Sequence, residues 1–376
     1  MSNESGVFPT DAKDLDTASL NTLIQTLHPD VTVDQFSIIK ELSFGDGSEP
    51  VSTAGRVEVA LSYQGQGSET LPKQLIIKVC RPDIAPRPLY RNEVAFYTRL
   101  RPELDIEAPV CIGGMFDENT ASFGLALEDL RVRGVSFPNV TTSPGVAHIK
   151  AVLSQLAKLH ATFWNSDKFY RELDWIKPHT EGELYELFNH PDLVPAVIQA
   201  EVDNNQFKLE LVQGVGQTPQ ALYQQLRTVQ QHQATLTPTL CHGDTHVGNT
   251  YARPDGGAGL YDWQLMARGY CMHDVSYVII TGLSVEERRA NEKDLIHFYL
   301  AELASNGVAL PPSFEQAFLE YRHAAVWCFY IGWLTTPIDN YGWDITVCNH
   351  IRLATAYRDL ETAAAVAQLP TGAAYS

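Results

Sequence analysis

The sequence has few of the features that mark secreted, zinc-binding or membrane proteins. Its six cysteines include no Cys-x-x-Cys pair, and the chain has 376 residues, whereas disulfide frameworks belong to short secreted chains. The longest apolar run, residues 324–334, is well short of the roughly 20 residues that a membrane helix requires. We therefore expect reduced cysteines, no cysteine-based zinc site and no membrane span.

Basic residues are scarce as well. Lys and Arg number 27 against 45 Asp and Glu, which gives a formal net charge of -18. A protein that binds nucleic acid neutralises phosphates with a basic face, so this balance argues against such a partner. An acidic surface would instead attract a cationic substrate. Residues 1–16 lack a basic region followed by an apolar one, so no signal peptide is predicted, and we expect a cytoplasmic monomer or homodimer.

The chain does have a globular composition, with 44% apolar and 19% charged residues, and enough length for two lobes. In its first third, apolar and β-branched segments separated by Gly, Ser and Pro clusters predict strands around one helix. The strand-like segments are 36–42, 55–63 and 73–79, and the helix is 89–100; two further apolar segments follow at 108–115 and 123–127.

From about residue 148 the apolar residues follow a helical period. Helices are predicted at 149–164, 181–189, 193–213, 218–233, 284–305, 313–335 and 345–367. His160, on the apolar face of the first, is interpreted as a core histidine. One short hairpin, 247–251 with 259–261, interrupts the helices. The pattern predicts an α+β fold with a small β-rich lobe, residues 1–129, and a larger helical lobe, residues 130–376.

The hairpin region gathers polar residues suited to phosphate chemistry. Asp244 precedes the first strand, Asn249 lies at its start, and Asp262 ends the returning strand. Carboxylate and amide oxygens are the ligands that magnesium prefers. Phosphoryl transfer needs such ligands and also a group that orients the attacking hydroxyl. By themselves these residues predict a magnesium site.

The stretch HGDTHVGN, residues 242–249, resembles the His-Gly-Asp-x-x-x-x-Asn catalytic loop of the aminoglycoside phosphotransferase and choline kinase superfamily. The resemblance is nearest to the branch that includes ecdysteroid-kinase-like proteins, and it implies a protein-kinase-like bilobal fold. It also implies that Asp244 is the catalytic base and that His242 braces the loop. Asn249 and Asp262 would then bind Mg2+.

Further residues match this family in order along the chain. Lys78 ends an apolar strand and Glu93 follows on the predicted helix, as the phosphate-binding lysine and partner glutamate of a kinase small lobe would. The LALEDL stretch resembles the hinge, which implies that ATP binds between the lobes with its adenine at Glu128 and Leu130. Asp274 resembles the family's helix-borne aspartate that supports the catalytic loop.

The sequence departs from the family pattern at two places. The expected glycine-rich loop reads SFGDGSEP, which is not a complete G-x-G-x-x-G; its nucleotide-binding candidates are Gly45, Gly47 and Ser48. Glu49 beside them would repel phosphates. Asp262 is followed by Trp and Gln instead of Phe and Gly, and only a short stretch precedes the next helix. This spacing argues against the long activation segment of a protein kinase.

These features predict an ATP- and magnesium-dependent small-molecule kinase that phosphorylates a hydroxyl group. Acidic residues are sparse and aromatic residues abundant around 324–337, which favours a neutral or partly apolar alcohol such as a hydroxylated lipid, a sterol-like compound or a hydroxyacyl compound. Three alternatives stay open. They are an aminoglycoside or other antibiotic phosphotransferase, a non-catalytic nucleotide-binding protein, and a zinc hydrolase that uses His242, Asp244 and His246.

Overall fold

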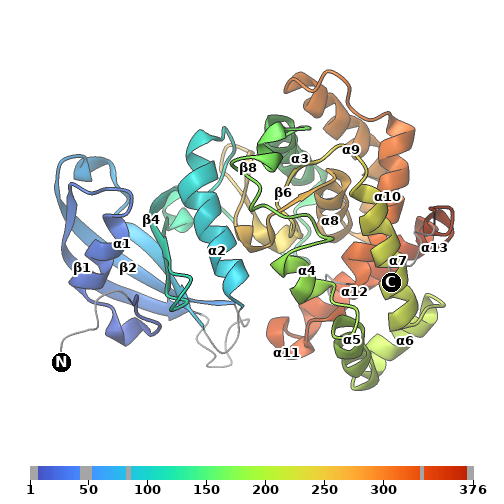
Figure 1. Cartoon of the computed structure of the whole chain (residues 1–376), viewed down its shortest axis with the longest axis horizontal. Coiled ribbons are helices and arrows are strands. Elements are labelled where there is room, and N and C mark those ends of the chain that lie inside the picture. Colours follow the sequence, from blue (N-terminus) through green and yellow to red (C-terminus); the bar gives the residue numbers. More distant parts are fainter. Residues whose placement is uncertain (1–6, 43–52, 82–85, 331–333, 371–376) are drawn as a thin grey trace. The chain divides into compact units, whose positions relative to one another are not determined.

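The structure is a computed structural model that describes residues 7–42, 53–81, 86–330 and 334–370. It divides into two compact units: a first unit of residues 1–136 with 261–264, and a second unit of residues 137–260 with 265–376. The first unit contains a five-stranded sheet and the second is mainly helical (Figure 1), so the predicted α+β class is confirmed. Within the described residues, no helix is both long enough and apolar enough to cross a bilayer.

The first unit is an antiparallel sheet with two main helices, and its strand order is β1-β2-β3-β5-β4. The strands are β1 (Val31–Leu42), β2 (Ala54–Gly65), β3 (Gln74–Cys80), β4 (Cys111–Phe116) and β5 (Phe123–Glu128). The helices are α1 (Thr17–Ile24) and α2 (Arg87–Ala95), with shorter turns η1 (Ala12–Asp14), η2 (Ser68–Thr70), η3 (Phe96–Leu100), η4 (Arg101–Glu103) and η5 (Leu130–Arg133).

The side chains of β3 alternate between a face that packs in the core and a face that carries Lys78. Leu75, Ile77 and Val79 are fully buried and belong to a core cluster that also contains residues of α1, β1 and β2. Successive side chains of a strand point to opposite faces. Lys78 therefore points to the other face of the sheet, where α2 supplies Glu93. The core on one face thus positions the lysine on the other.

The helix predicted at 89–100 exists, but it changes from an α-helix to a π-helix after Ala95. After α2 ends at Ala95, the turn η3 is a π-helix, in which the N–H of Arg101 donates to the carbonyl of Phe96. The Thr98 hydroxyl donates to the Val94 carbonyl at 2.8 Å, and hydroxyls that compete for backbone carbonyls loosen a helix. The wider turn still buries Phe96 and Leu100.

The second unit consists mainly of helices, with two short strand pairs. Its helices are α3 (Gly145–Thr162), α4 (Glu183–Phe188), α5 (Val194–Asp203), α6 (Gln206–Gly214), α7 (Pro219–Gln233), α8 (Met272–Gly282), α9 (Val285–Ser305), α10 (Phe314–Phe329), α11 (Ile338–Tyr341), α12 (Trp343–Asp359) and α13 (Thr362–Val366). Strand β6 (Thr239–Cys241) pairs with β9 (Ala267–Gly269), and β7 (Thr250–Ala252) pairs with β8 (Ala258–Leu260). Short turns of this unit are η6 (Asp167–Tyr170) and η7 (Val247–Asn249); the turn η8 (Trp263–Leu265) begins in the part of the chain assigned to the first unit and ends in the second.

Several boundaries predicted from the sequence are wrong. The single helix predicted at 193–213 is two helices, because the Asn205 side chain accepts the N–H of Lys208 and starts α6. The helix predicted at 345–367 breaks at Glu361, whose φ of 50° is left-handed. The hairpin's first strand begins at Thr250, because residues 247–249 form η7.

Helix α8 is the main element for which the hydrophobic pattern gave no signal. All of its residues, from Met272 to Gly282, are buried. A helix buried on all sides has no polar face, so its sequence lacks the amphipathic period on which a prediction depends.

Candidate functional site

The first unit holds a buried lysine–glutamate pair. Nζ of Lys78 on β3 donates to both carboxylate oxygens of Glu93 on α2, each at 2.6 Å, and the two side chains are 8% and 1% exposed. Burial raises the pKa of the Glu93 carboxyl; the Lys78 ammonium opposes this rise and the Asp262 carboxylate adds to it. Charges this far from water are tolerated only when they are paired, so each residue holds the other in place.

Gln264 connects this pair to the segment that carries Asp262. Its Nε2 donates to Glu93 Oε2 at 3.4 Å, and its Oε1 accepts from Thr53 Oγ1 at 2.8 Å. Its backbone carbonyl accepts from Asn92 Nδ2 at 3.2 Å. Sequence reasoning treated this glutamine only as a departure from the family pattern. Its role depends on three partners far away in the chain, so no local signal could have revealed it.

Asp262 presents a carboxylate oxygen that no group in the described part of the chain satisfies. Its Oδ1 is buried and, within the described residues, accepts no hydrogen bond. Its φ of 64° is left-handed, a conformation that aspartate tolerates better than most residues do. A buried carboxylate oxygen without a partner is costly. This oxygen therefore fits a bound cation such as Mg2+, which prefers oxygen ligands.

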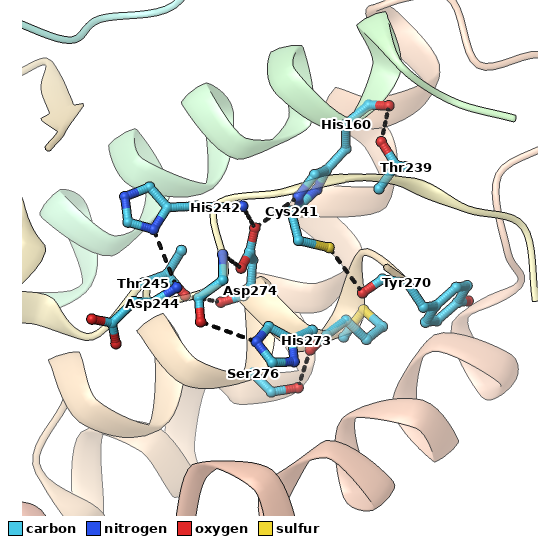
Figure 2. Close-up of polar contacts among 12 residues, drawn as sticks. His160, Thr239, Cys241, His242, Asp244, Thr245, Tyr270, His273, Asp274 and Ser276 are labelled. Atoms are coloured by element: carbon cyan, nitrogen blue, oxygen red, sulfur yellow. Dashed lines mark hydrogen bonds and ion pairs between the residues drawn. The ribbon is translucent and has the colours of Figure 1, made fainter. Parts of the chain in front are cut away.

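The second unit anchors its loop at 242–249 on one buried aspartate. Asp274, in the first turn of α8, accepts from the N–H of His242 through Oδ2 at 2.7 Å and from the N–H of Gly243 through Oδ1 at 2.9 Å (Figure 2). The Thr245 hydroxyl donates to the backbone carbonyl of Asp274 at 2.7 Å. Three polar groups of the loop are thus bound to one residue, and the chain path before Asp244 is set by this anchor.

His160, which is bonded to Tyr299, holds the anchor Asp274 in place. His160 Nε2 lies 3.2 Å from Asp274 Oδ2, and His160 Nδ1 lies 2.7 Å from the Tyr299 hydroxyl. The predicted core histidine is therefore confirmed. Burial disfavours the carboxylate, but the hydrogen bond and charge of His160, together with nearby imidazoles, outweigh burial and lower the pKa of Asp274 to about 2. His273 adds a donor, since its Nε2 lies 3.2 Å from the carbonyl of Gly243.

Gly243 cannot carry a side chain where it stands. Its φ is 86°, and a Cβ at this position would lie 1.9 Å from the carbonyl oxygen of Leu265. Real atoms do not approach so closely, so any larger residue would displace the loop or the chain beside it. The glycine of the His-Gly-Asp motif is therefore required by packing.

Asp244 points away from the anchor, as Figure 2 shows, and its side chain is 27% exposed. Asn249 Nδ2 donates to Asp244 Oδ2 at 3.0 Å and to the Asp244 carbonyl at 2.9 Å. The fully buried His242 accepts the N–H of Asp244 at its Nδ1, at 3.2 Å. These bonds use the amide nitrogen of Asn249, so its oxygen is the end that could face a cation.

The predicted adenine-binding residues lie at the end of β5. The N–H of Glu128 donates to the Val110 carbonyl and the N–H of Asp129 to the Gln74 carbonyl, at 2.9 and 3.0 Å. The Glu128 carboxylate accepts from the N–H of Val110 at 2.9 Å. These two N–H groups are therefore engaged within the first unit, and Leu130 begins η5 beside them.

Gly45, Gly47 and Ser48 of the predicted glycine-rich loop lie outside the described residues. Thr53 lies shortly after them in the chain, and its carbonyl accepts from the Tyr90 hydroxyl at 2.6 Å. Thr53 is therefore tied to α2.

The zinc reading of His242, Asp244 and His246 finds no support. The Nδ1 atoms of both histidines accept backbone N–H groups of their own loop. Among the described residues, two groups have ligand atoms close enough together to hold a metal, and neither includes these three. The groups are His160 with Cys241 and Asp274, and His232 with Glu320 and His323.

The chain is similar to known proteins in sequence and in fold. Residues 49–310 match the sequence model of the ecdysteroid kinase-like family. Among solved structures, the ethanolamine kinase of Plasmodium vivax has a TM-score of 0.51 at 12% identity and covers 88% of this chain and 84% of its own. A candidate aminoglycoside phosphotransferase from Ralstonia eutropha has a TM-score of 0.50 at 13% identity and covers 92% and 98%. No curated protein matches the sequence significantly. At these identities, the two structures indicate a shared fold alone.

Proposed function

The chain belongs to the ecdysteroid kinase-like family, and from this premise we propose that it is a small-molecule kinase that transfers the γ-phosphoryl group of ATP to a hydroxyl group. The observation that carries the proposal is the pair of Lys78 with Glu93, joined through both carboxylate oxygens at 2.6 Å. A lysine that is buried and oriented in this way is of little use for solubility. It is suited to bind the phosphates of a nucleotide.

The first unit would bind the nucleotide. Lys78 would contact the phosphates, and the carbonyl of Glu128 and the N–H of Leu130 are the backbone groups that we assign to adenine. Asp262 would bind magnesium through its buried Oδ1, and Asn249 would offer its amide oxygen. When bound, magnesium neutralises the charge that builds up on the phosphates during transfer.

Asp244 would orient the acceptor hydroxyl and take its proton. The Asn249 amide and the His242 ring hold Asp244 in place, so that little reorganisation is needed before transfer. Positioning and electrostatic stabilisation supply most of the rate enhancement in such a reaction. In this proposal His242 is a positioning residue, because it is fully buried behind the loop.

For the acceptor we propose a neutral or partly apolar alcohol: a hydroxylated lipid, a sterol-like compound or a hydroxyacyl compound. Trp327 of α10 packs on His273, with ring centroids 4.5 Å apart, and His273 contacts the carbonyl of Gly243, next to Asp244. Aromatic packing thus extends from α10 to the loop that carries Asp244. The net charge of -18 is the one observation that favours the alternative, a polycationic aminoglycoside.

The experiment is ATP consumption by the purified full chain with a pooled library of hydroxyl compounds, with and without EDTA. The proposal expects magnesium-dependent turnover with at least one neutral alcohol, and its loss in Asp244→Ala. Turnover with aminosugars alone would support the alternative acceptor. Nucleotide binding without turnover on any pool would indicate a non-catalytic protein and overturn the proposal.

A further inference from the structure

A second cluster of polar side chains lies on α7 and α10, and the proposed reaction uses none of its members. His232 is in the last turn of α7, and its Nε2 lies 2.7 Å from Oε1 of Glu320. His323, one turn later on α10, has its Nδ1 3.2 Å from the same oxygen. Residues three apart on a helix share a face. Glu320 and His323 therefore both lie on the face of α10 that contacts His232.

We propose that His232, Glu320 and His323 form a binding site for a zinc ion. One ligand atom from each residue lies within 4.8 Å of the other two. Two imidazoles and one carboxylate are a ligand set that suits Zn2+, whereas Mg2+ and Ca2+ prefer oxygen ligands alone. The site is therefore chemically distinct from the magnesium ligands Asp262 and Asn249.

The surroundings of the cluster resemble those of a metal site. Gln233 Nε2 donates to Oε2 of Glu320 at 3.1 Å. This bond holds the second carboxylate oxygen and leaves Oε1 turned toward the two imidazoles. Hydrogen bonds of this kind orient metal ligands and tune their affinity. Burial of Glu320 opposes ionisation, but His323 and His232 outweigh it and keep the pKa of this carboxyl below its usual value.

The site has an entry path and a position for a fourth ligand. The His232 side chain is 25% exposed, whereas those of Glu320 and His323 are 7% and 1% exposed. Solvent therefore reaches the cluster from the His232 side, where water would complete a tetrahedral shell. A zinc ion would take the place of the hydrogen bonds that now join Glu320 to the two rings.

The other cluster with suitable spacing does not share these properties. Both carboxylate oxygens of Asp274 already accept loop N–H groups, and His160 bonds to Tyr299 through its second nitrogen. His160, Cys241 and Asp274 are all fully buried. That group is satisfied without a metal and has no entry path, so the proposal concerns only the cluster on α7 and α10.

Zinc at this position would link two helices that lead toward the catalytic loop. After α7 the chain runs through residues 234–238 into β6 and then to His242. Helix α10 carries Trp327, which packs on His273. We therefore expect zinc to raise the thermal stability of the protein, since a ligand that binds only the folded state stabilises it.

The test is titration of metal-free full-length protein with ZnCl2 by calorimetry, and with CoCl2 by visible absorption. We expect one equivalent to bind, a Co2+ spectrum typical of tetrahedral geometry, and a higher melting temperature with zinc. His232→Ala and Glu320→Gln should each lose all three effects, and Gln233→Ala should weaken binding by about 10–100-fold. His190→Ala is the matched control, because His190 is a partly exposed histidine outside the cluster.

Further controls separate this site from other metal sites and from misfolding. Asp262→Ala must keep the zinc response. Cys241→Ser must leave it intact as well, since a response that this change removes would place the metal at His160, Cys241 and Asp274. His232→Ala changes the most exposed ligand, and its unfolding without metal reports whether it folds. A wild-type protein that binds no stoichiometric zinc, or a folded His232→Ala that binds it normally, would overturn the proposal.

Discussion

The indole of Trp263 lies flat on the ring of Phe96, with centroids 3.6 Å apart and planes 6° apart. Both side chains are fully buried. Trp263 directly follows Asp262, and Phe96 directly follows α2, which carries Glu93. The stack therefore holds the segment of the proposed magnesium ligand against the helix that positions Lys78.

We expect Trp263→Ala to destabilise the protein by about 3–5 kcal/mol, because it leaves a large cavity under Phe96. In the fraction that remains folded, the magnesium concentration needed for nucleotide binding should rise, since Asp262 loses its support. Urea unfolding and calorimetric titration with ATP and Mg2+ measure the two effects. The control is Trp343→Ala, because Trp343 is 55% exposed and should change neither. Unchanged magnesium dependence in folded Trp263→Ala would contradict this role of the stack.

A double-mutant cycle tests the Lys78–Glu93 pair. Lys78→Met leaves a carboxylate buried without its partner and should cost about 3–5 kcal/mol of stability. Adding Glu93→Gln removes the unpaired charge and should restore much of that loss. Turnover should stay low in both proteins, because neither has the ammonium group for the phosphates. If the double mutant recovered turnover along with stability, the pair would have only a structural role.

Asp244→Ala should lower turnover by about 10²–10⁴-fold, the contribution of a positioned general base. ATP binding should persist, because the residues assigned to the nucleotide are unchanged. Steady-state kinetics on the substrate found in the library, together with calorimetry, separate the two readouts. Asp255→Ala is the matched control, since Asp255 is an exposed aspartate in the turn of the hairpin that follows Asp244. An equal loss of activity in both variants would point to a disturbed hairpin instead of a lost base.

Gly243→Ala and Gly256→Ala separate steric overlap from backbone strain. Both glycines have a φ of 86°, but a Cβ on Gly256 meets nothing within 4 Å, whereas one on Gly243 would overlap the Leu265 carbonyl. Gly256→Ala should therefore cost only about 1–2 kcal/mol, the strain of a left-handed residue. Gly243→Ala should cost more and should also reduce turnover, because the loop before Asp244 must move. Equal stability losses with normal turnover in both variants would contradict the overlap.

The anchor Asp274 predicts a specific pH dependence. Its pKa is lowered from 3.8 to about 2 in the folded protein, so the carboxylate stabilises the fold by about 2 kcal/mol at neutral pH. This stability is fully present above about pH 4 and is lost as the pH falls through about 2. Asp274→Asn lacks it, so the gap in unfolding free energy between wild type and variant should be largest near neutral pH and shrink in acid. Asp294→Asn, on the exposed surface of α9, is the control and should show no gap. A gap that does not vary with pH would mean that Asp274 is not ionised in the folded state.

Much of the fold could be predicted because the relevant patterns are local. The alternation in β3 and the helical period of α3 and α7 are visible within short windows. Lys78 and Glu93 could be paired from their place in such elements and from a family resemblance. The break at Asn205 could not be predicted, because it depends on one side-chain hydrogen bond. The burial of α8 could not be predicted either, because it depends on what packs around the helix.

The sequence by itself determined which polar residues accompany the hairpin and in what order they follow one another. Only the tertiary structure decided what each can do. Asp244 and Asp274 are the same amino acid, but Asp274 is fully buried and both of its oxygens accept loop N–H groups, whereas Asp244 is partly exposed and held by an amide. The chemistry of a carboxylate depends on its burial and its partners. Most of those partners come from distant parts of the chain, so folding makes one aspartate an anchor and leaves the other partly exposed to solvent.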